Sequence, residues 1–253
     1  MQAAKKTHLA TKLGRFVQLS EREFECLAEL QSSPIQVKRG QELTYEGQTE
    51  QVAHILQSGW ACSFKTLPDG GRQIIAFPVP GDIVGLRSLL LRTADHSFAV
   101  LTDAVVTRLT VPRILQVFNE MPHLAVAILW ATSRDEAMVV EHLASVGRRN
   151  SVERTAHFFL ELYDRLRLVG LSRETEFNCP LTQNLLADAL GLSTIHVNRV
   201  LRQLRERNLL TLKDHKVVIH DLGALAALAG YVIPEINPVV AVGIRARRGT
   251  DLD

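Results

Sequence analysis

The chain has 253 residues, of which 46% are hydrophobic and 22% are charged, and its formal net charge is +2. This composition excludes an intrinsically disordered chain, because the apolar content is high and the net charge is low. At roughly 150 residues per domain, the length predicts one or two domains. The small net charge also argues against a nucleic-acid-binding protein, since such proteins are usually strongly basic.

Cysteine spacing and the hydropathy profile argue against disulfide-rich, metal-cluster and membrane-spanning proteins. Cys26, Cys62 and Cys179 are far apart and form no CxxC pair, which argues against a disulfide framework, structural zinc or a cysteine-bound iron–sulfur cluster. The apolar residues 222–234 are fewer than the ~20 that cross a bilayer. Residues 1–20 are basic but lack the apolar core of a secretory signal. We therefore expect a cytoplasmic protein with a frayed N-terminus, a transit peptide being the alternative.

Short apolar and β-branched runs separated by turns occupy residues 34–110. The predicted strands cover residues 34–38, 52–57, 60–66, 72–77, 97–101 and 104–109. The turn sequence Pro68-Asp69-Gly70-Gly71 lies between two of these runs and predicts a hairpin. Turns at intervals of about 8–12 residues indicate a β-sandwich or jelly roll.

A long helix is predicted after this region, because no glycine or proline lies between Pro122 and Gly147. Its apolar residues form two stripes, one of Leu124, Ile128, Ala131, Met138 and His142 and the other of Leu129, Val139, Leu143 and Val146. A helix with two apolar faces either packs inside one domain or pairs with a second copy of the chain, and the length favours the dimer. Residues 147–150 predict a hinge, after which Ser151 is expected to cap another helix that ends near residue 168.

The most informative pattern is in residues 180–208. Thr182 is placed to cap a short helix that ends near Leu190, and Gly191 follows where a left-handed turn is needed. Ser193 is placed to cap the next helix, which is expected to run to about residue 208. Two helices joined by so short a turn form a helix-turn-helix. Residues 209–212 and 217–220 then predict a two-stranded wing, and Asp221 is expected to cap a last helix.

The second of these helices divides into two faces. Val197, Val200 and Leu204 recur at helical spacing and predict the buried face. The opposite face carries arginine, asparagine and small or apolar groups, which suit the guanine, adenine and thymine edges of the DNA major groove. A solvated basic helix is the alternative, but an exposed Ile195 argues against it. Residues 193–208 carry a net charge of +3, so the small total charge conceals a local basic face.

The order of a β-roll, a long helix and a winged helix-turn-helix resembles the Crp/Fnr family of bacterial transcription regulators over roughly residues 20–230. The motif Gly191-Leu-Ser-Thr-Ile-His-Val-Asn-Arg-Val-Leu carries the resemblance. It implies a homodimer on a twofold-symmetric DNA site, with RNA polymerase as a further partner. Arg199 falls on the family's guanine-contacting arginine, while Ile195 replaces a glutamate found in many members. The expected DNA contacts are Thr182, Ser193, Thr194, Ile195, His196, Asn198, Arg199 and Arg202.

The resemblance weakens at the ligand-binding cassette of the family. Residues 80–85 match its opening, but Leu86 replaces the glutamate that holds the ribose of cyclic AMP. His96 replaces the arginine that pairs with the cyclic phosphate, and Ser97 is retained. Because leucine accepts no hydrogen bond and a neutral histidine substitutes poorly for a guanidinium, cyclic AMP is disfavoured and no cofactor is predicted. An effector of another kind would contact Gly85, Leu86, His96 and Ser97. Haem bound through His54, His96, His123 or His142 is a further alternative.

The predicted class is α+β, with an N-terminal jelly-roll sensor domain, a long dimerisation helix and a C-terminal winged helix-turn-helix domain. These occupy residues 1–120, 121–149 and 150–231, and a tail of unknown role covers residues 232–253. The predicted function is DNA-binding transcription regulation rather than catalysis, because no nucleophile elbow and no P-loop is present. A cupin-type metal site lacks its paired histidines. A ligand sensor that acts through a protein partner without DNA is the remaining alternative.

Overall fold

A computed structural model describes residues 7–91 and 93–233 of the chain. Its first elements are the helices α1 (His8–Leu13) and α2 (Glu21–Leu30), which are capped by Thr7 and Ser20. The prediction of a frayed N-terminus is wrong for residues 7–20, since Leu9 and Leu13 are buried in the core beneath the β-roll. With only six residues, α1 is too short for a helical repeat of apolar residues to be recognised in the sequence.

Two antiparallel four-stranded sheets form the N-terminal domain and confirm the predicted sandwich. Their orders are β1-β8-β3-β6 and β2-β7-β4-β5. The core between them includes Leu56, Phe98 and Val106. The 3-10 helix η1 (Leu86–Leu89) follows β6. The strands are β1 (Pro34–Val37), β2 (Glu42–Thr44), β3 (Val52–Ser58), β4 (Ala61–Thr66), β5 (Arg72–Ala76), β6 (Ile83–Val84), β7 (Ser97–Val100) and β8 (Ala104–Thr110).

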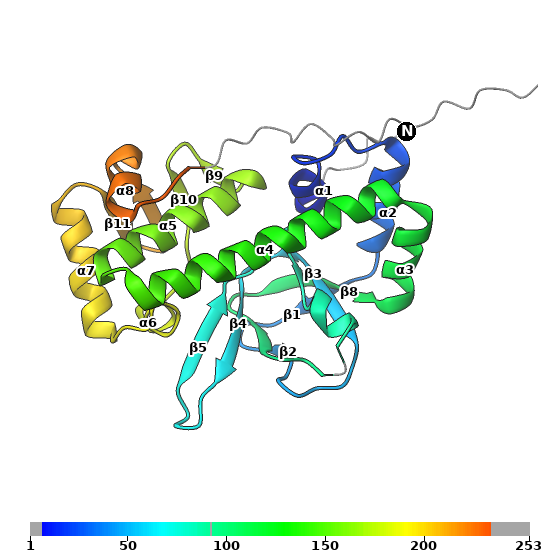
Figure 1. The fold of residues 1–253 in the computed structure, drawn as a ribbon, viewed down its shortest axis with the longest axis horizontal. Coiled ribbons are helices and arrows are strands. Elements are labelled where there is room, and N and C mark those ends of the chain that lie inside the picture. Colours follow the sequence, from blue (N-terminus) through cyan, green and yellow to red (C-terminus); the bar gives the residue numbers. More distant parts are fainter. Residues whose placement is uncertain (1–6, 92, 234–253) are drawn as a thin grey trace, which may run out of the picture.

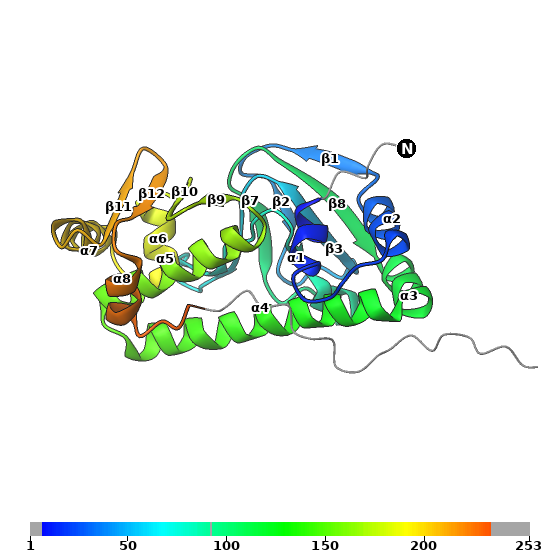
Figure 2. The same cartoon turned by 90° about the horizontal axis from the view of Figure 1, so that it is seen from above.

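The helix α4 (Pro122–Arg148) follows the short α3 (Val111–Glu120) and runs along the whole molecule in both views (Figures 1 and 2). One of its two predicted stripes faces its own chain, because Leu124, Ile128 and Ala131 are buried. The other stripe is exposed at Leu129, Val139 and Leu143. A 27-residue helix therefore leaves an apolar face uncovered in the single chain.

The C-terminal domain contains the helix-turn-helix and the predicted two-stranded wing, and the wing belongs to a larger four-stranded sheet. The sheet order is β11-β12-β10-β9, because two short strands before the helix-turn-helix pair with the wing. The helix that follows the hinge is capped by Asn150 and not by Ser151. The elements are α5 (Ser151–Leu168), β9 (Ser172–Arg173), β10 (Glu176–Asn178), α6 (Gln183–Leu190), α7 (Thr194–Glu206), β11 (Leu210–Lys213), β12 (Lys216–Ile219) and α8 (Leu222–Ala229).

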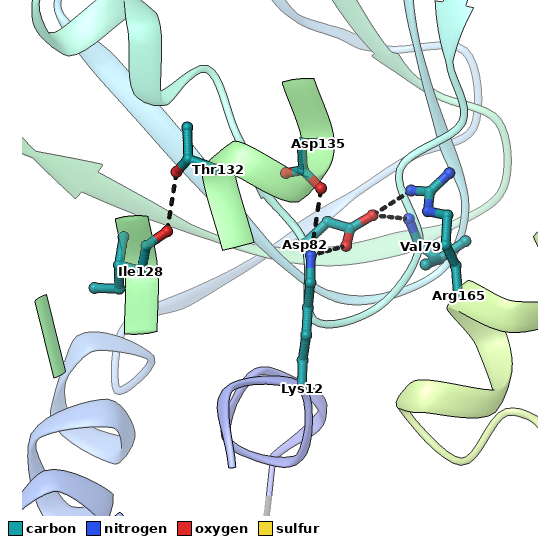
Figure 3. A network of polar contacts seen from close by, with 7 residues as sticks. All are labelled: Lys12, Val79, Asp82, Ile128, Thr132, Asp135 and Arg165. Carbon is teal, nitrogen blue, oxygen red and sulfur yellow. Dashed lines mark hydrogen bonds and ion pairs between the residues drawn. The ribbon is translucent and has the colours of Figure 1, made fainter. Parts of the chain in front are cut away.

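A buried polar network joins α1, the β-roll, α4 and α5 (Figure 3). Asp82 lies at its centre and accepts from Lys12 Nζ at 2.8 Å and from Arg165 Nη2 at 2.6 Å. The backbone N–H of Val79 also donates to this carboxylate, and Asp135 of α4 lies 3.7 Å from the ammonium. Burial raises the pKa of Asp82, but the two cations outweigh it and hold the pKa at about 2.

A second set of contacts ties the sheet containing β4 and β5 to the C-terminal domain. Arg72 of β5 pairs with Asp188 of α6 at 2.8 Å, and the side chain of Gln73 donates to the carbonyl of Ala189. Side chains from both domains share one apolar cluster, which includes Phe77 and Phe159. The α6–α7 pair is thus held against the β-roll by polar and apolar contacts.

Candidate nucleic-acid interface

The turn between α6 and α7 is built from the capping residues that the sequence places there. Thr182 Oγ1 accepts from the N–H of Leu185, and Ser193 Oγ accepts from the N–H of His196. Gly191 has φ +61°, the left-handed conformation that a residue with a side chain adopts at a cost. The predicted helix-turn-helix is therefore present, although α7 ends at Glu206 rather than at residue 208.

The two faces of α7 are separated as the periodicity predicts. Val197, Val200 and Leu204 are buried in the core of the C-terminal domain. Ile195 is 83% exposed, and Asn198 and Arg199 beside it are exposed as well. Both views place α7 at the end of the molecule opposite α2 and α3 (Figures 1 and 2). An accessible helix face with an uncovered branched apolar residue has the shape and the groups that a major-groove reader needs.

The start of α7 is fixed to α6 by a side-chain hydrogen bond. Thr194 Oγ1 donates to Asn184 Oδ1 at 3.1 Å. This bond links the two helices next to Ile195. Asn184 was not among the predicted contacts, because its spacing in the sequence gives no sign that it reaches the second helix.

The two exposed arginines of this face have different partners. Arg199 Nη2 donates to His196 Nε2 at 3.0 Å, and Ser151 Oγ lies 3.0 Å from the same nitrogen. Arg202 instead pairs with Glu206 at 2.7 Å, one turn further along the helix. Both members of that ion pair are largely exposed, so a DNA phosphate can compete for the guanidinium at little cost.

Arg154 of α5 joins the helix-turn-helix to the end of the long helix. Its guanidinium donates to the carbonyl oxygens of Ser145 and Val146 in α4 and of Arg149 in the hinge. It also donates to the carbonyl of Leu190, the last residue of α6, at 2.6 Å. These carbonyls lie at helix ends and in the hinge, where backbone partners are scarce, although the carbonyl of Ser145 also accepts from the N–H of Arg149. The sequence analysis missed Arg154, although the pattern Asn150-x-x-Glu153 is a capping box that locates the start of α5.

The wing has a tight two-residue turn next to a buried cysteine. Asp214 and His215 both have positive φ between β11 and β12. The N–H of Cys179 donates to the carbonyl of His215 at 2.7 Å, and burial raises the pKa of the Cys179 thiol to about 12. A thiol with so high a pKa is a poor nucleophile, so its burial serves packing.

The predicted effector segment is brought together but turned to internal contacts. Gly85 has φ +81° and precedes η1, in which Leu86 packs against the core cluster beneath α4. At the other end of the segment, Ser97 Oγ accepts from the N–H of Glu46 at 3.1 Å. The backbone turn of the cassette is therefore present, while Leu86, one of the four predicted effector residues, is partly buried against the apolar core.

An ion pair closes the effector segment. Arg87 pairs with Asp95, whose other oxygen lies 2.8 Å from His96 Nδ1. Burial, and then the nearby guanidinium of Arg87, lower the pKa of His96 from its usual value. The ring is thus neutral at pH 7 and donates to the carboxylate.

Outside this segment, the described part of the chain has cavities at two further places. One of about 240 Å³ lies between α2 and α3, and one of about 520 Å³ lies between the β-roll and the start of α6. Within residues 7–91 and 93–233, no group of three or more metal-binding side chains is found. Over the same residues, the helices are too short or too polar to cross a membrane.

Comparisons with known proteins agree with both halves of the molecule. Residues 34–121 match the cyclic nucleotide-binding domain, and residues 153–228 match the Crp-like helix-turn-helix domain. The transcriptional regulatory protein btr of Bordetella pertussis is 30% identical over 211 residues, which cover 82% of this chain and 86% of that protein. The nitrogen fixation regulation protein FixK of Rhizobium meliloti is 28% identical over 183 residues, or 72% of this chain and 79% of that protein.

The fold comparison leads to the same group. FixK2 from Bradyrhizobium japonicum superposes with a TM-score of 0.69 and 25% sequence identity, covering 78% of this chain and 96% of that one. Three findings agree on the family: the domain order, the exposed face of α7 and the extent of the match to btr. The chain belongs to the Crp/Fnr family of DNA-binding transcription regulators.

Proposed function

We propose that the chain acts as a homodimer that places α7 of each subunit in successive major grooves of a twofold-symmetric DNA site. The exposed face of α7 carries the proposal, because Ile195 is uncovered and Arg199 has no acidic partner among the contacts of the described chain. In this role the protein regulates transcription in the cytoplasm rather than catalysing a reaction. RNA polymerase is the partner that such regulation requires.

The uncovered face of α4 supports the dimer. Val126, Leu129, Val140 and Leu143 are exposed and fall at the first and fourth positions of a seven-residue repeat. A second α4 would cover all four. Leu143→Arg is expected to raise the dimer dissociation constant at least about tenfold, because it places like charges across the seam. Leu90→Arg, at an 85% exposed site on the β-roll, is the matched control. Light scattering across a dilution series measures both, and an unchanged Leu143→Arg dimer would contradict this seam.

Base recognition follows from the groups that α7 exposes. The Arg199 guanidinium suits the O6 and N7 acceptors of guanine, and Ile195 with the methyl group of Thr194 suits a thymine methyl. Asn198 lies on the same face and suits adenine. Selection of binding sites from random DNA tests these assignments: the selected half-site should contain a guanine whose preference is lost in Arg199→Ala.

We further propose that cyclic AMP is not the effector. Leu86 is partly buried against the core cluster and has no acceptor for a ribose hydroxyl, His96 is neutral, and Arg87 is paired with Asp95. Among the described residues 80–91 and 93–97, the segment therefore offers no unpaired guanidinium for a phosphate. An effector of another kind would have to use Gly85, His96 and Ser97 or a different cavity.

The alternative function is a sensor that acts through a protein partner without DNA. A gel-shift titration with genomic fragments at several salt concentrations separates the two. DNA binding should weaken steeply with salt, because the basic face of α7 displaces counterions from the phosphates. Absence of any salt-dependent complex would favour the protein partner.

A further inference from the structure

A hydrogen-bonded chain leads from the hinge to the arginine that we expect to read a base. His196 Nε2 lies 3.0 Å from Ser151 Oγ and 3.0 Å from Arg199 Nη2. A guanidinium can only donate, so Nε2 is an acceptor and the proton of the neutral ring lies on Nδ1. The Ser151 hydroxyl then shares the single lone pair of this nitrogen with the guanidinium, so both donors contact the same edge of the imidazole.

The first member of this chain is fixed to the long helix. Ser151 is the first residue of α5 and directly follows Asn150, whose side chain caps that helix. One turn later, Arg154 binds carbonyls of α4, the hinge and α6. The position of the Ser151 hydroxyl therefore follows the position of the hinge relative to the helix-turn-helix.

The last member of the chain keeps its charge and most of its donors. A guanidinium has five N–H groups, and the bond to His196 uses one of them. The partner is a neutral ring, whereas Arg202 on the same face is paired with the carboxylate of Glu206. Arg199 is thus oriented without being neutralised, which is the state that favours bidentate binding to guanine.

We propose that Ser151 and His196 are positioning residues that orient the Arg199 guanidinium before DNA binds. Through them, the orientation of the guanidinium depends on the position of the hinge after α4. The proposal rests on the base-reading role of Arg199 given above. Ser151 is the deciding position, because it lies on α5 and not on the face of α7 that we expect to contact DNA.

The test compares full-length variants on two synthetic duplexes, one with the selected guanine in each half-site and one with adenine in its place. Ser151→Ala and His196→Ala should each reduce the guanine-over-adenine preference by about 3–10-fold, the usual worth of one hydrogen bond. His196→Gln should restore most of it, since its amide oxygen can accept from Arg199. Affinity for non-specific DNA and the melting temperature should stay within error for Ser151→Ala, which a merely structural role would not predict.

The wing supplies a matched control, in which Thr211 Oγ1 lies 2.8 Å from His220 Nε2. Thr211→Ala removes a hydroxyl–imidazole bond of the same kind and should leave the preference at the guanine unchanged. Ser151→Ala should also add nothing to Arg199→Ala, because both act through the same contact.

The outcomes separate this proposal from the one it rests on. If Arg199→Ala abolishes the guanine preference while Ser151→Ala leaves it intact, the positioning role is overturned and the base-reading role stands. If Ser151→Ala weakens both duplexes equally, its effect is structural and the positioning role is again overturned. If Arg199→Ala itself leaves the preference intact, both proposals fail.

Discussion

The cassette segment of the β-roll and the exposed face of α7 use polar side chains in opposite ways. In the cassette, Asp82 is enclosed by Lys12 and Arg165, and Arg87 is paired with Asp95. On α7, Arg199 is held by a neutral imidazole and remains exposed. Both segments resemble motifs of one family, but the charged groups of the cassette are paired within the chain, whereas Arg199 is exposed and has no acidic partner among the described contacts. We therefore expect the face of α7, and not the cassette, to bind its ligand.

This contrast predicts that cassette substitutions change stability and that α7 substitutions change DNA recognition. The largest effect is expected from Lys12→Met, which leaves Asp82 and Asp135 without their shared ammonium in a buried site. Removing one partner of a buried ion pair costs about 3–5 kcal/mol. The midpoint of urea unfolding should fall accordingly.

The control for that variant is a surface ion pair of similar length. Lys38 and Asp103 are 2.7 Å apart, but their side chains are 84% and 62% exposed. Lys38→Met should change the free energy of unfolding by no more than about 1 kcal/mol. Equal losses of unfolding free energy in the two variants would show that the buried network stabilises the fold no more than a surface ion pair does.

Arg199→Ala should lower DNA affinity and leave the stability of the fold almost unchanged, the reverse of Lys12→Met. Loss of a bidentate arginine–guanine contact is expected to cost about 1–3 kcal/mol per half-site and to relax preference at that base. Its free energy of unfolding should change by less than about 0.5 kcal/mol, because the residue is exposed. Fluorescence anisotropy with matched duplexes and urea unfolding measure the two quantities.

Arg202→Ala separates charge from base recognition on the same helix. It should weaken binding to all sequences alike and reduce the slope of log affinity against log salt by about 1. The roles assigned to the two arginines would have to be exchanged if Arg202→Ala changed base preference at one position of the site and Arg199→Ala lowered affinity for all sequences alike.

The sequence predicts best those elements whose signals are local. Thr182, Gly191 and Ser193 locate α6 and α7, because caps and a left-handed glycine act within one turn of the chain. The period of Val197, Val200 and Leu204 likewise gives the buried face, and with it the exposure of Ile195.

What the sequence does not reveal depends on partners distant in the chain. The two residues of β6 form a strand only because His54 and Ile55 of β3 pair with them. The short helix α1 is anchored by Lys12 on Asp82, 70 positions away. Ser151 likewise reaches His196 across 45 positions, so the positioning chain of Arg199 has no local signature.

The acid limb of the stability curve tests the cassette network in another way. The pKa of Asp82 is about 2, below the ordinary value of 3.8, so its stabilisation is present above about pH 4 and is lost as the pH falls towards 2. A shift of this size corresponds to roughly 2–3 kcal/mol. The difference in unfolding free energy between wild type and Asp82→Asn should therefore shrink from pH 5 to pH 2. A difference independent of pH would contradict the ionised state of Asp82.

The smallest effect is expected when cyclic nucleotides are added to the wild-type protein. A cyclic phosphate needs a fixed cation, but the guanidinium of Arg87 is paired with Asp95, and the burial of His96 keeps its ring neutral. The ribose hydroxyl needs an acceptor, and Leu86 has none. Calorimetric titration with cyclic AMP and cyclic GMP should give no saturable heat, and DNA affinity should not change on their addition. A dissociation constant in the micromolar range would show that the cassette rearranges to free these groups. The pairing of the cassette side chains would then be a regulated state of a working ligand site rather than the loss of that site.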